Sequence, residues 1–323
     1  MKRAAKIWLI CAVALVLLGT VIFAGAMSML NWNFLRLSNN KCETNEYEIN
    51  DAFSNISVKA DTADIVFLQS NDEKTHVICR EYKNENHSVK VTDNTLTIEL
   101  TDTRKWYEHI SFILLETPSI KIYLPEENYK LLDIKSSTGD IEIPDFLKLE
   151  SVNANLSTGD INLLASSDFA GLKTDTGNIN VENITVGKLE IVVSTGDITV
   201  KNTTCEGYIS INATTGDVSV CDTRCHSLVS KGTTGYITLK NTIAKSLFSI
   251  ERDTGDVELE KCDAEEILIV TDTGHVHGTL LSDKVFITSS DTGKIRVPES
   301  TTGGKCKITT DTGDIKITVK ALH

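Results

Sequence analysis

The sequence predicts an all-β protein whose body is a parallel β-helix, a solenoid of about 19–20 residues per coil, preceded by one transmembrane helix. Three observations support this prediction. A Thr-Gly pair recurs at a nearly fixed spacing, apolar residues alternate with polar ones on both sides of each pair, and an uncharged segment lies near the N-terminus.

The Thr-Gly pairs mark the corners of the predicted coils. Successive glycines lie 18 to 20 residues apart, which is typical of a solenoid. Isoleucine or valine stands two residues after each glycine. The ten repeat glycines are Gly139, Gly159, Gly177, Gly196, Gly216, Gly235, Gly255, Gly274, Gly293 and Gly313.

Apolar residues occupy every second position, which is the period of a strand. Before each glycine the apolar residues lie an odd number of residues away from it, and after the glycine they lie an even number away. The same face of the chain can stay inward across such a shift only where the backbone bends, and glycine permits the bend through a positive φ. Each repeat therefore reads as strand, bend, strand and a polar turn, which carries Asn183, Asn202, Asp222 or Asn241 in four of the repeats.

Two short strands cannot bury an apolar face alone, whereas stacked coils form a continuous core. At roughly 4.8 Å per coil, the regular coils make a rod of roughly 48 Å. A β-propeller or a leucine-rich horseshoe fits less well, because a propeller blade needs about 40 residues or more and the Leu/Asn consensus of the horseshoe is absent.

The N-terminal segment is predicted to anchor the protein in the cell membrane. Residues 1–6 contain three basic residues and should stay in the cytoplasm, and residues 7–30 carry no charge. A helix of that length reaches ~36 Å, enough for a single-pass signal anchor. The alternative is a cleaved signal peptide, because Ala24-Gly25-Ala26 resembles a cleavage site. The apolar run continues past that site, which favours the anchor, and both interpretations place the solenoid in an extracellular position.

The rest of the chain divides into three parts. Residues 31–42 are a juxtamembrane linker, residues 43–130 form irregular N-terminal coils and a cap, and residues 131–323 form the regular repeats. Within the cap, Ala63 replaces the corner glycine of a degenerate coil, residues 87–98 form a hairpin around Asp93-Asn94, and residues 104–112 form an insertion loop.

The C-terminal residues 314–320 are expected to form the open edge strand of the rod. Outward lysines on this strand would discourage edge-to-edge aggregation. The alternative is that another subunit docks there, which gives end-to-end self-association.

The composition excludes some partners. The net charge of −13 disfavours nucleic-acid binding, and aromatic residues make up only 6% of the chain. The expected partners are the membrane, through residues 7–30, and an unidentified envelope glycan or protein.

The repeated Asp-Thr-Gly triplet is also the local signature of aspartic proteases. Those enzymes need two copies that share one proton, whereas here the triplet repeats as a bend motif. Stacked acids could instead bind calcium. The simpler interpretation is that aspartates cap the backbone of the bends. The acids concerned are Asp175, Asp253, Asp256, Asp272, Asp291, Asp311 and Asp314.

Two further groups contain metal-ligand residue types. Cys221, Cys225 and His226 lie close in sequence without an evident fourth ligand, and His275 and His277 are expected to be a solvated pair. A carbohydrate-active β-helix enzyme would need long loops that form the walls of a substrate groove. The coils here vary too little in length to supply such loops. We therefore expect no catalytic residue, no metal site and no cofactor.

An N-terminal anchor followed by serial Ser/Asp-Thr-Gly-Asp-Ile repeats resembles the bacterial "putative adhesin" family of β-strand-repeat proteins, a domain of unknown function. The resemblance covers about Glu43 to Val319 and departs at Tyr236, His275 and Lys294, where aspartate is usual. It implies a right-handed single-stranded β-helix at the cell surface. The expected function is a non-catalytic adhesin or envelope-interaction module. The alternatives are an envelope-stress or regulatory partner protein and a carbohydrate-active enzyme.

Cys205 and Cys225 each lie nine residues after a repeat glycine, which places them on adjacent coils at a separation compatible with a disulfide. The alternative is two stacked free thiols. We predict that peptide masses measured with and without reductant reveal the bridge. A Cys205 peptide whose mass is the same in both conditions would exclude it.

Overall fold

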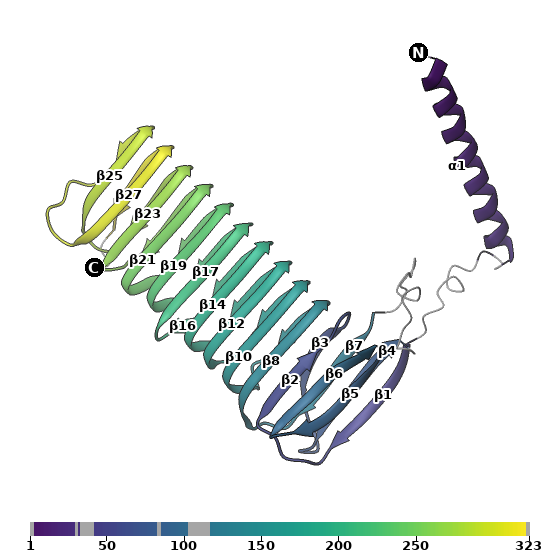
Figure 1. The fold of residues 1–323 in the computed structure, drawn as a ribbon. Coiled ribbons are helices and arrows are strands. Elements are labelled where there is room, and N and C mark those ends of the chain that lie inside the picture. The colour runs from purple at the N-terminus through teal and green to yellow at the C-terminus, as the bar shows by residue number, and fades with distance from the viewer. Residues whose placement is uncertain (1–2, 30–31, 33–41, 83–84, 103–116, 321–323) are drawn as a thin grey trace.

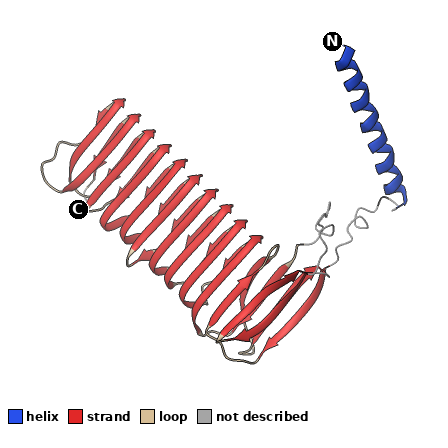
Figure 2. Cartoon of the chain, viewed as in Figure 1, coloured by secondary structure: helices blue, strands red, loops and turns tan. Residues whose placement is uncertain are grey.

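The computed structural model describes residues 3–29, 32, 42–82, 85–102 and 117–320. One helix, α1 (Arg3–Met29), precedes a rod of stacked β-strands (Figures 1 and 2). Residues 8–29 of α1 are long and apolar enough to cross a membrane. The predicted insertion loop at residues 104–112 and most of the linker lie outside the described residues.

The body of the rod consists of two facing sheets. The strands that end at the repeat threonines form one sheet, the long-strand sheet. Its regular strands are β8 (Asn128–Thr138), β10 (Lys148–Thr158), β12 (Ser167–Thr176), β14 (Thr185–Thr195), β16 (Thr204–Cys205), β17 (Tyr208–Thr215), β19 (Arg224–Thr234), β21 (Ile243–Thr254), β23 (Glu266–Thr273), β25 (Lys284–Thr292) and β27 (Gly304–Thr312).

The strands that follow the repeat glycines form the other sheet, the short-strand sheet. Its regular strands are β9 (Ile141–Ile143), β11 (Ile161–Leu163), β13 (Ile179–Glu182), β15 (Ile198–Lys201), β18 (Val218–Cys221), β20 (Ile237–Lys240), β22 (Val257–Cys262), β24 (Val276–Leu280), β26 (Ile295–Arg296) and β28 (Ile315–Val319).

Successive coils stack in parallel and in register. Thr158 lies opposite Thr176 in the long-strand sheet, and Ile161 lies opposite Ile179 in the short-strand sheet. The inward residues are fully buried, as at Ile161 and Ile179. This arrangement confirms the predicted parallel β-solenoid with its Thr-Gly corners aligned in a row.

The glycine column is required by close packing between coils. Eight repeat glycines have φ between 121° and 155°, whereas Gly274 and Gly293 lie outside the left-handed range. All ten share a stronger restraint. A Cβ atom on any of them would lie less than 3.0 Å from the backbone carbonyl oxygen of the residue stacked against it. The predicted bend is therefore present, but the contact between corners explains glycine at every one of them.

The N-terminal cap is built from antiparallel strands as well as coils. Its strands are β1 (Cys42–Ile49), β2 (Asn55–Lys59), β3 (Asp64–Gln69), β4 (Thr75–Tyr82), β5 (Glu85–Thr92), β6 (Thr95–Asp102) and β7 (Ser119–Leu124). The predicted hairpin is confirmed, because β5 and β6 pair across Asp93 and Asn94, which both have positive φ.

The degenerate coil at Ala63 is confirmed, but its place in the rod differs from the order of the chain. Its strands β2 and β3 stack directly on β8 and β9, with Ile56 opposite Leu132 and Ile65 opposite Ile141. Strands β6 and β7, which come later in the sequence, form the next layer outward. Nothing therefore separates the Ala63 coil from the Gly139 coil, and the irregular strands lie beyond both.

The predicted open edge at residues 314–320 is wrong. Strand β28 pairs with β24 from Ile315 to Val319, and β27 lies between β23 and β25. The end of the rod is instead the coil formed by β25 and β26, where Ile295 is 42% exposed although its neighbour Ile315 is fully buried. The glycine steps on either side of this coil are nearly equal, so the spacing could not reveal that the last coil of the chain lies inside the rod and the preceding coil lies at its end. End-to-end self-association stays a prediction, and it would use β25 and β26.

We predict that Gly216→Val destabilises the protein, because φ at Gly216 is 139° and a Cβ atom would overlap the carbonyl oxygen of Gly196. The strain alone costs about 1–3 kcal/mol. Urea denaturation measures the free energy of unfolding. The control Thr238→Val, on the outward face of β20, should stay within about 0.5 kcal/mol of the parent. Equal stability of the two variants would contradict the packing described for the corner.

Candidate functional site

A column of exposed threonines follows one edge of the rod, at the ends of the strands of the long-strand sheet. We call it the threonine ladder. Its members are Thr138, Thr158, Thr176, Thr195, Thr215, Thr234, Thr254, Thr273, Thr312 and Thr292, in stacking order.

The hydroxyl groups of the threonine ladder have no structural partner. Within the described residues, none of the ten donates or accepts a side-chain hydrogen bond, and all ten residues are exposed. Their backbone carbonyls do take part in the stacking, since Thr176 O accepts from Gly159 N–H at 2.9 Å. The fold therefore uses the backbone at this column and leaves the hydroxyls to solvent.

A second polar column, the flanking ladder, lies immediately before the threonines in sequence. Its members are Ser137, Ser157, Asp175, Ser194, Thr214, Thr233, Asp253, Asp272, Asp311 and Asp291, again in stacking order. Asp175 pairs with Lys173 at 3.7 Å. The last four members, Asp253, Asp272, Asp311 and Asp291, lie on consecutive coils. The C-terminal coils of the rod therefore carry a row of exposed carboxylates. The two ladders form a repetitive polar surface at roughly 4.8 Å per step.

The aspartates that follow the glycines have a different role. Each carboxylate accepts the backbone N–H of the corresponding residue on the next coil, as Asp140 does from Asp160 at 2.9 Å and Asp197 does from Asp217 at 2.8 Å. Asn178 acts in the same way on Asp197. For this column the interpretation that the acids cap backbone amides is confirmed, with the difference that the bond joins two coils. The five aspartates that precede the repeat threonines, such as Asp253 and Asp272, accept no backbone amide within the described residues.

Besides Asn178, three residues depart from aspartate in this column. His275 replaces the carboxylate, because its Nδ1 accepts from Asp314 N–H at 2.9 Å. Lys294 lies on the end coil, where no further coil offers an amide to be capped. The Tyr236 ring is 56% exposed. The amide of Lys294 donates to Asp314 and lowers the pKa of that carboxyl, and the nearby charges of Lys294 and Arg296 lower it further.

The candidate metal ligands that the sequence suggests have different fates, and Asp253, Asp272, Asp311 and Asp291 stack on consecutive coils. The carboxylates of Asp256 and Asp314 accept hydrogen bonds from backbone N–H groups. Cys225 is buried in the core, whereas His226 is exposed and Cys221 is half-buried. His275 and His277 do come together, with stacked rings 5.4 Å apart on the surface.

Cys205 and Cys225 lie on adjacent coils, as predicted, because the neighbouring residues Thr204 and Arg224 are paired. Both are free, buried thiols in the structure. The disulfide stays a prediction.

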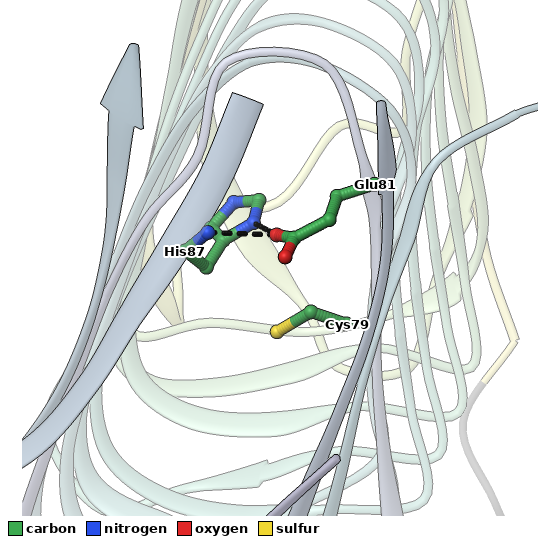
Figure 3. A group of neighbouring side chains, drawn as sticks. All are labelled: Cys79, Glu81 and His87. Atoms are coloured by element: carbon green, nitrogen blue, oxygen red, sulfur yellow. Dashed lines mark hydrogen bonds and ion pairs between the residues drawn. The ribbon is translucent and has the colours of Figure 1, made fainter. Parts of the chain in front are cut away.

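The cap contains a buried cluster that sequence reasoning missed. Cys79 and Glu81 on β4 and His87 on β5 point toward one another (Figure 3). Within the described residues this is the only set of three or more Cys, His, Asp or Glu side chains whose ligand atoms lie within 4.8 Å of one another. The pattern Cys-x-Glu on the inward face of a strand, at positions that should be apolar, was the available signal.

The cluster is held by hydrogen bonds across the two sheets. Glu81 Oε2 accepts from the backbone N–H of His87 at 2.7 Å and lies 2.5 Å from His87 Nδ1, and Asn45 Nδ2 donates to Glu81 Oε1 at 2.6 Å. The Tyr47 hydroxyl donates to the carbonyl of His87. Burial, and then the charge of Glu81, raises the pKa of the Cys79 thiol to about 12, so the thiol is protonated at neutral pH.

Hollows in the described surface are open grooves. One of about 550 Å³ runs beside the first residues of β10, β12 and β14, and its charged lining includes Lys148, Glu150, Asp168 and Glu206. This groove lies away from both ladders and from the cap cluster.

The chain matches a sequence family described as Toastrack DUF4097 at residues 53–167 and 164–223, which together span more than half of its length. No curated protein shows significant sequence similarity to it.

Several solved structures resemble this chain over most of its length. A protein named "putative adhesin" from Bacteroides fragilis is 18% identical, with a TM-score of 0.41 over 87% of this chain and 98% of that one. A "putative lipid binding protein" from Parabacteroides distasonis is 17% identical, with a TM-score of 0.45 over the same shares. A "putative adhesin" from Parabacteroides merdae is 15% identical, with a TM-score of 0.43, again over 87% of this chain and 98% of that one.

We predict that Asp217→Ala destabilises the rod by about 1 kcal/mol, because Asp217 Oδ1 accepts the N–H of Tyr236 at 2.8 Å. Asp217→Asn keeps an acceptor, as Asn178 does naturally, and should lose clearly less. Urea denaturation of both variants measures the difference. If both lost the same free energy, charge and not the hydrogen bond would be responsible.

Proposed function

The chain belongs to the Toastrack DUF4097 family, and on that premise we propose that it is a membrane-anchored, extracellular adhesin-type module. It binds a ligand of the cell envelope along the threonine ladder and the flanking ladder. The rod is non-catalytic and acts through an extended surface.

The unused hydroxyls of the threonine ladder carry this proposal. A position at the end of an exposed strand accepts any residue that favours extended backbone, and valine or isoleucine would serve as well as threonine. Threonine nevertheless stands at all ten corners, exposed and without a side-chain hydrogen bond in the described part of the chain. Because the fold does not need the hydroxyls, their regular array is best explained by a ligand.

The form of the surface favours an extended ligand that is rich in hydroxyl groups, such as an envelope glycan. Hydroxyls and carboxylates repeat along the rod at roughly 4.8 Å per step, so a polymer can make the same weak contact many times. Contacts that are weak singly become strong together when both partners repeat. A rigid rod also holds all the contacts in place before binding, which reduces the entropic cost of association.

The N-terminal anchor supports the location. Three basic residues precede the apolar segment of α1, which favours a cytoplasmic N-terminus and an extracellular rod. An adhesive surface on the outside of the cell membrane can reach both the envelope and molecules outside it.

We predict that full-length protein in detergent micelles binds glycans on an array, and that the double variant Thr215→Val, Thr234→Val binds at least tenfold more weakly. Valine keeps the size and the strand preference of threonine and removes only the hydroxyl. The matched control carries the same substitution at Thr199 and Thr238, on the short-strand sheet. Urea denaturation should show similar stability for both variants.

The assay separates the alternatives. Equal binding by the ladder variant would place the ligand on another surface. Release of a cleaved product would favour a carbohydrate-active enzyme, and an absence of any binding would favour an envelope-stress or regulatory partner.

A further inference from the structure

We propose that Cys79, Glu81 and His87 form a binding site for a zinc-class divalent metal ion, which joins the two sheets at the N-terminal end of the rod. The ligands come from opposite sheets, since β4 lies between β1 and β7 in one sheet and β5 is the edge strand of the other.

The positions of the three side chains suit a shared ion. Cys79 and Glu81 are two residues apart on β4 and therefore point to the same side, toward His87 on β5 (Figure 3). Their ligand atoms lie within 4.8 Å of one another. Zinc binds sulfur at about 2.3 Å and nitrogen or oxygen at about 2.0–2.2 Å, so its ligands stand roughly 3 to 4 Å apart. Small rotations of the side chains would bring the three atoms to these distances.

The donor set selects the class of ion. A thiolate, an imidazole and a carboxylate are the three kinds of ligand that zinc takes in proteins, whereas calcium and magnesium prefer oxygen alone. On binding, the Cys79 thiol loses its proton to solvent, and His87 binds as a neutral imidazole whose single proton stays on the ring nitrogen that does not face the ion. One thiolate and one carboxylate then balance the two charges of the ion, which leaves a buried centre without net charge.

Burial makes a purely structural role for the cluster costly. Cys79 is fully buried, Glu81 is 1% exposed and His87 is 6% exposed. In the regular coils, mainly apolar side chains fill the corresponding interior, and ionisable groups are expensive to place there without compensation. His87 Nε2 is buried and has no hydrogen-bond partner in the described residues. The ring can therefore turn toward an ion without giving up a bond at this nitrogen.

The surroundings already hold the ligands in place. Asn45 fixes one oxygen of Glu81, and Tyr47 fixes the backbone of His87. Both residues lie on β1, so a third strand orients the groups that would bind the ion, as outer hydrogen bonds do in known metal centres. An ion here would clamp the end of the solenoid that has no Thr-Gly corner.

The experiment uses the full-length chain in detergent, stripped of metal with a chelator and titrated with Co²⁺. We expect one equivalent of Co²⁺ to bind and to produce the charge-transfer absorption of a cobalt–thiolate bond. Zn²⁺ should displace it and raise the midpoint of thermal unfolding. Cys79→Ser should abolish the absorption, and His87→Gln should weaken Co²⁺ binding at least tenfold.

Two controls identify the site. Cys306→Ser removes another fully buried thiol whose pKa burial also raises to about 12, and it should leave the absorption unchanged. The double variant His275→Gln, His277→Gln removes the surface histidine pair, which has no thiol, and should also leave it unchanged.

The wild-type chain provides a test that does not depend on the folding of a variant. One equivalent of Zn²⁺ should slow the reaction of Cys79 with a thiol reagent at least tenfold, as followed by peptide mass. The proposal is overturned by an unchanged rate, by Co²⁺ binding without the thiolate absorption, or by an absorption that survives Cys79→Ser.

Discussion

The close approach of one corner to the next is the constraint on which the rest of the rod depends. At each repeat glycine, a Cβ atom would stand less than 3.0 Å from a carbonyl oxygen of the adjacent corner. Glycine allows the coils to meet at strand spacing, and this contact fixes their register. Once the register is fixed, every column of the repeat becomes a ladder of identical environments, and each side chain acts on its equivalents above and below.

Each column of the repeat has a different role in the protein. Inward residues such as Ile161 and Ile179 fill the core. The aspartates after the glycines accept hydrogen bonds from backbone N–H groups of the next coil. His275 can replace an aspartate because the position requires only an acceptor. Within the described residues, only the threonine column is constant and exposed while its side chains make no hydrogen bond. A surface of this kind is suited to many equal contacts with an extended partner, whereas a pocket would need the coils to differ.

The two ends of the rod break the rule that the order of coils follows the order of the chain. At the C-terminus, β27 and β28 enter between the coil of β23 and β24 and the coil of β25 and β26. At the N-terminus, β8 returns to stack on β2 after the cap strands have been placed on the other side. The cap that results combines antiparallel strands with a buried polar cluster, where the interior of the regular coils is mainly apolar.

The sequence by itself determined the coil, its corners and its inward columns, because these depend on residues near one another in the chain and recur at a constant spacing. Only the tertiary structure decided which coils are neighbours. The steps from Gly274 to Gly293 and on to Gly313 are nearly equal, so either stacking order satisfies them. The same holds for contacts between coils. Gly232 looks ordinary in the sequence, yet it makes room for the buried guanidinium of Arg252 on the adjacent coil. Such pairs depend on stacking, and stacking is set by surfaces that exist only when the chain has folded.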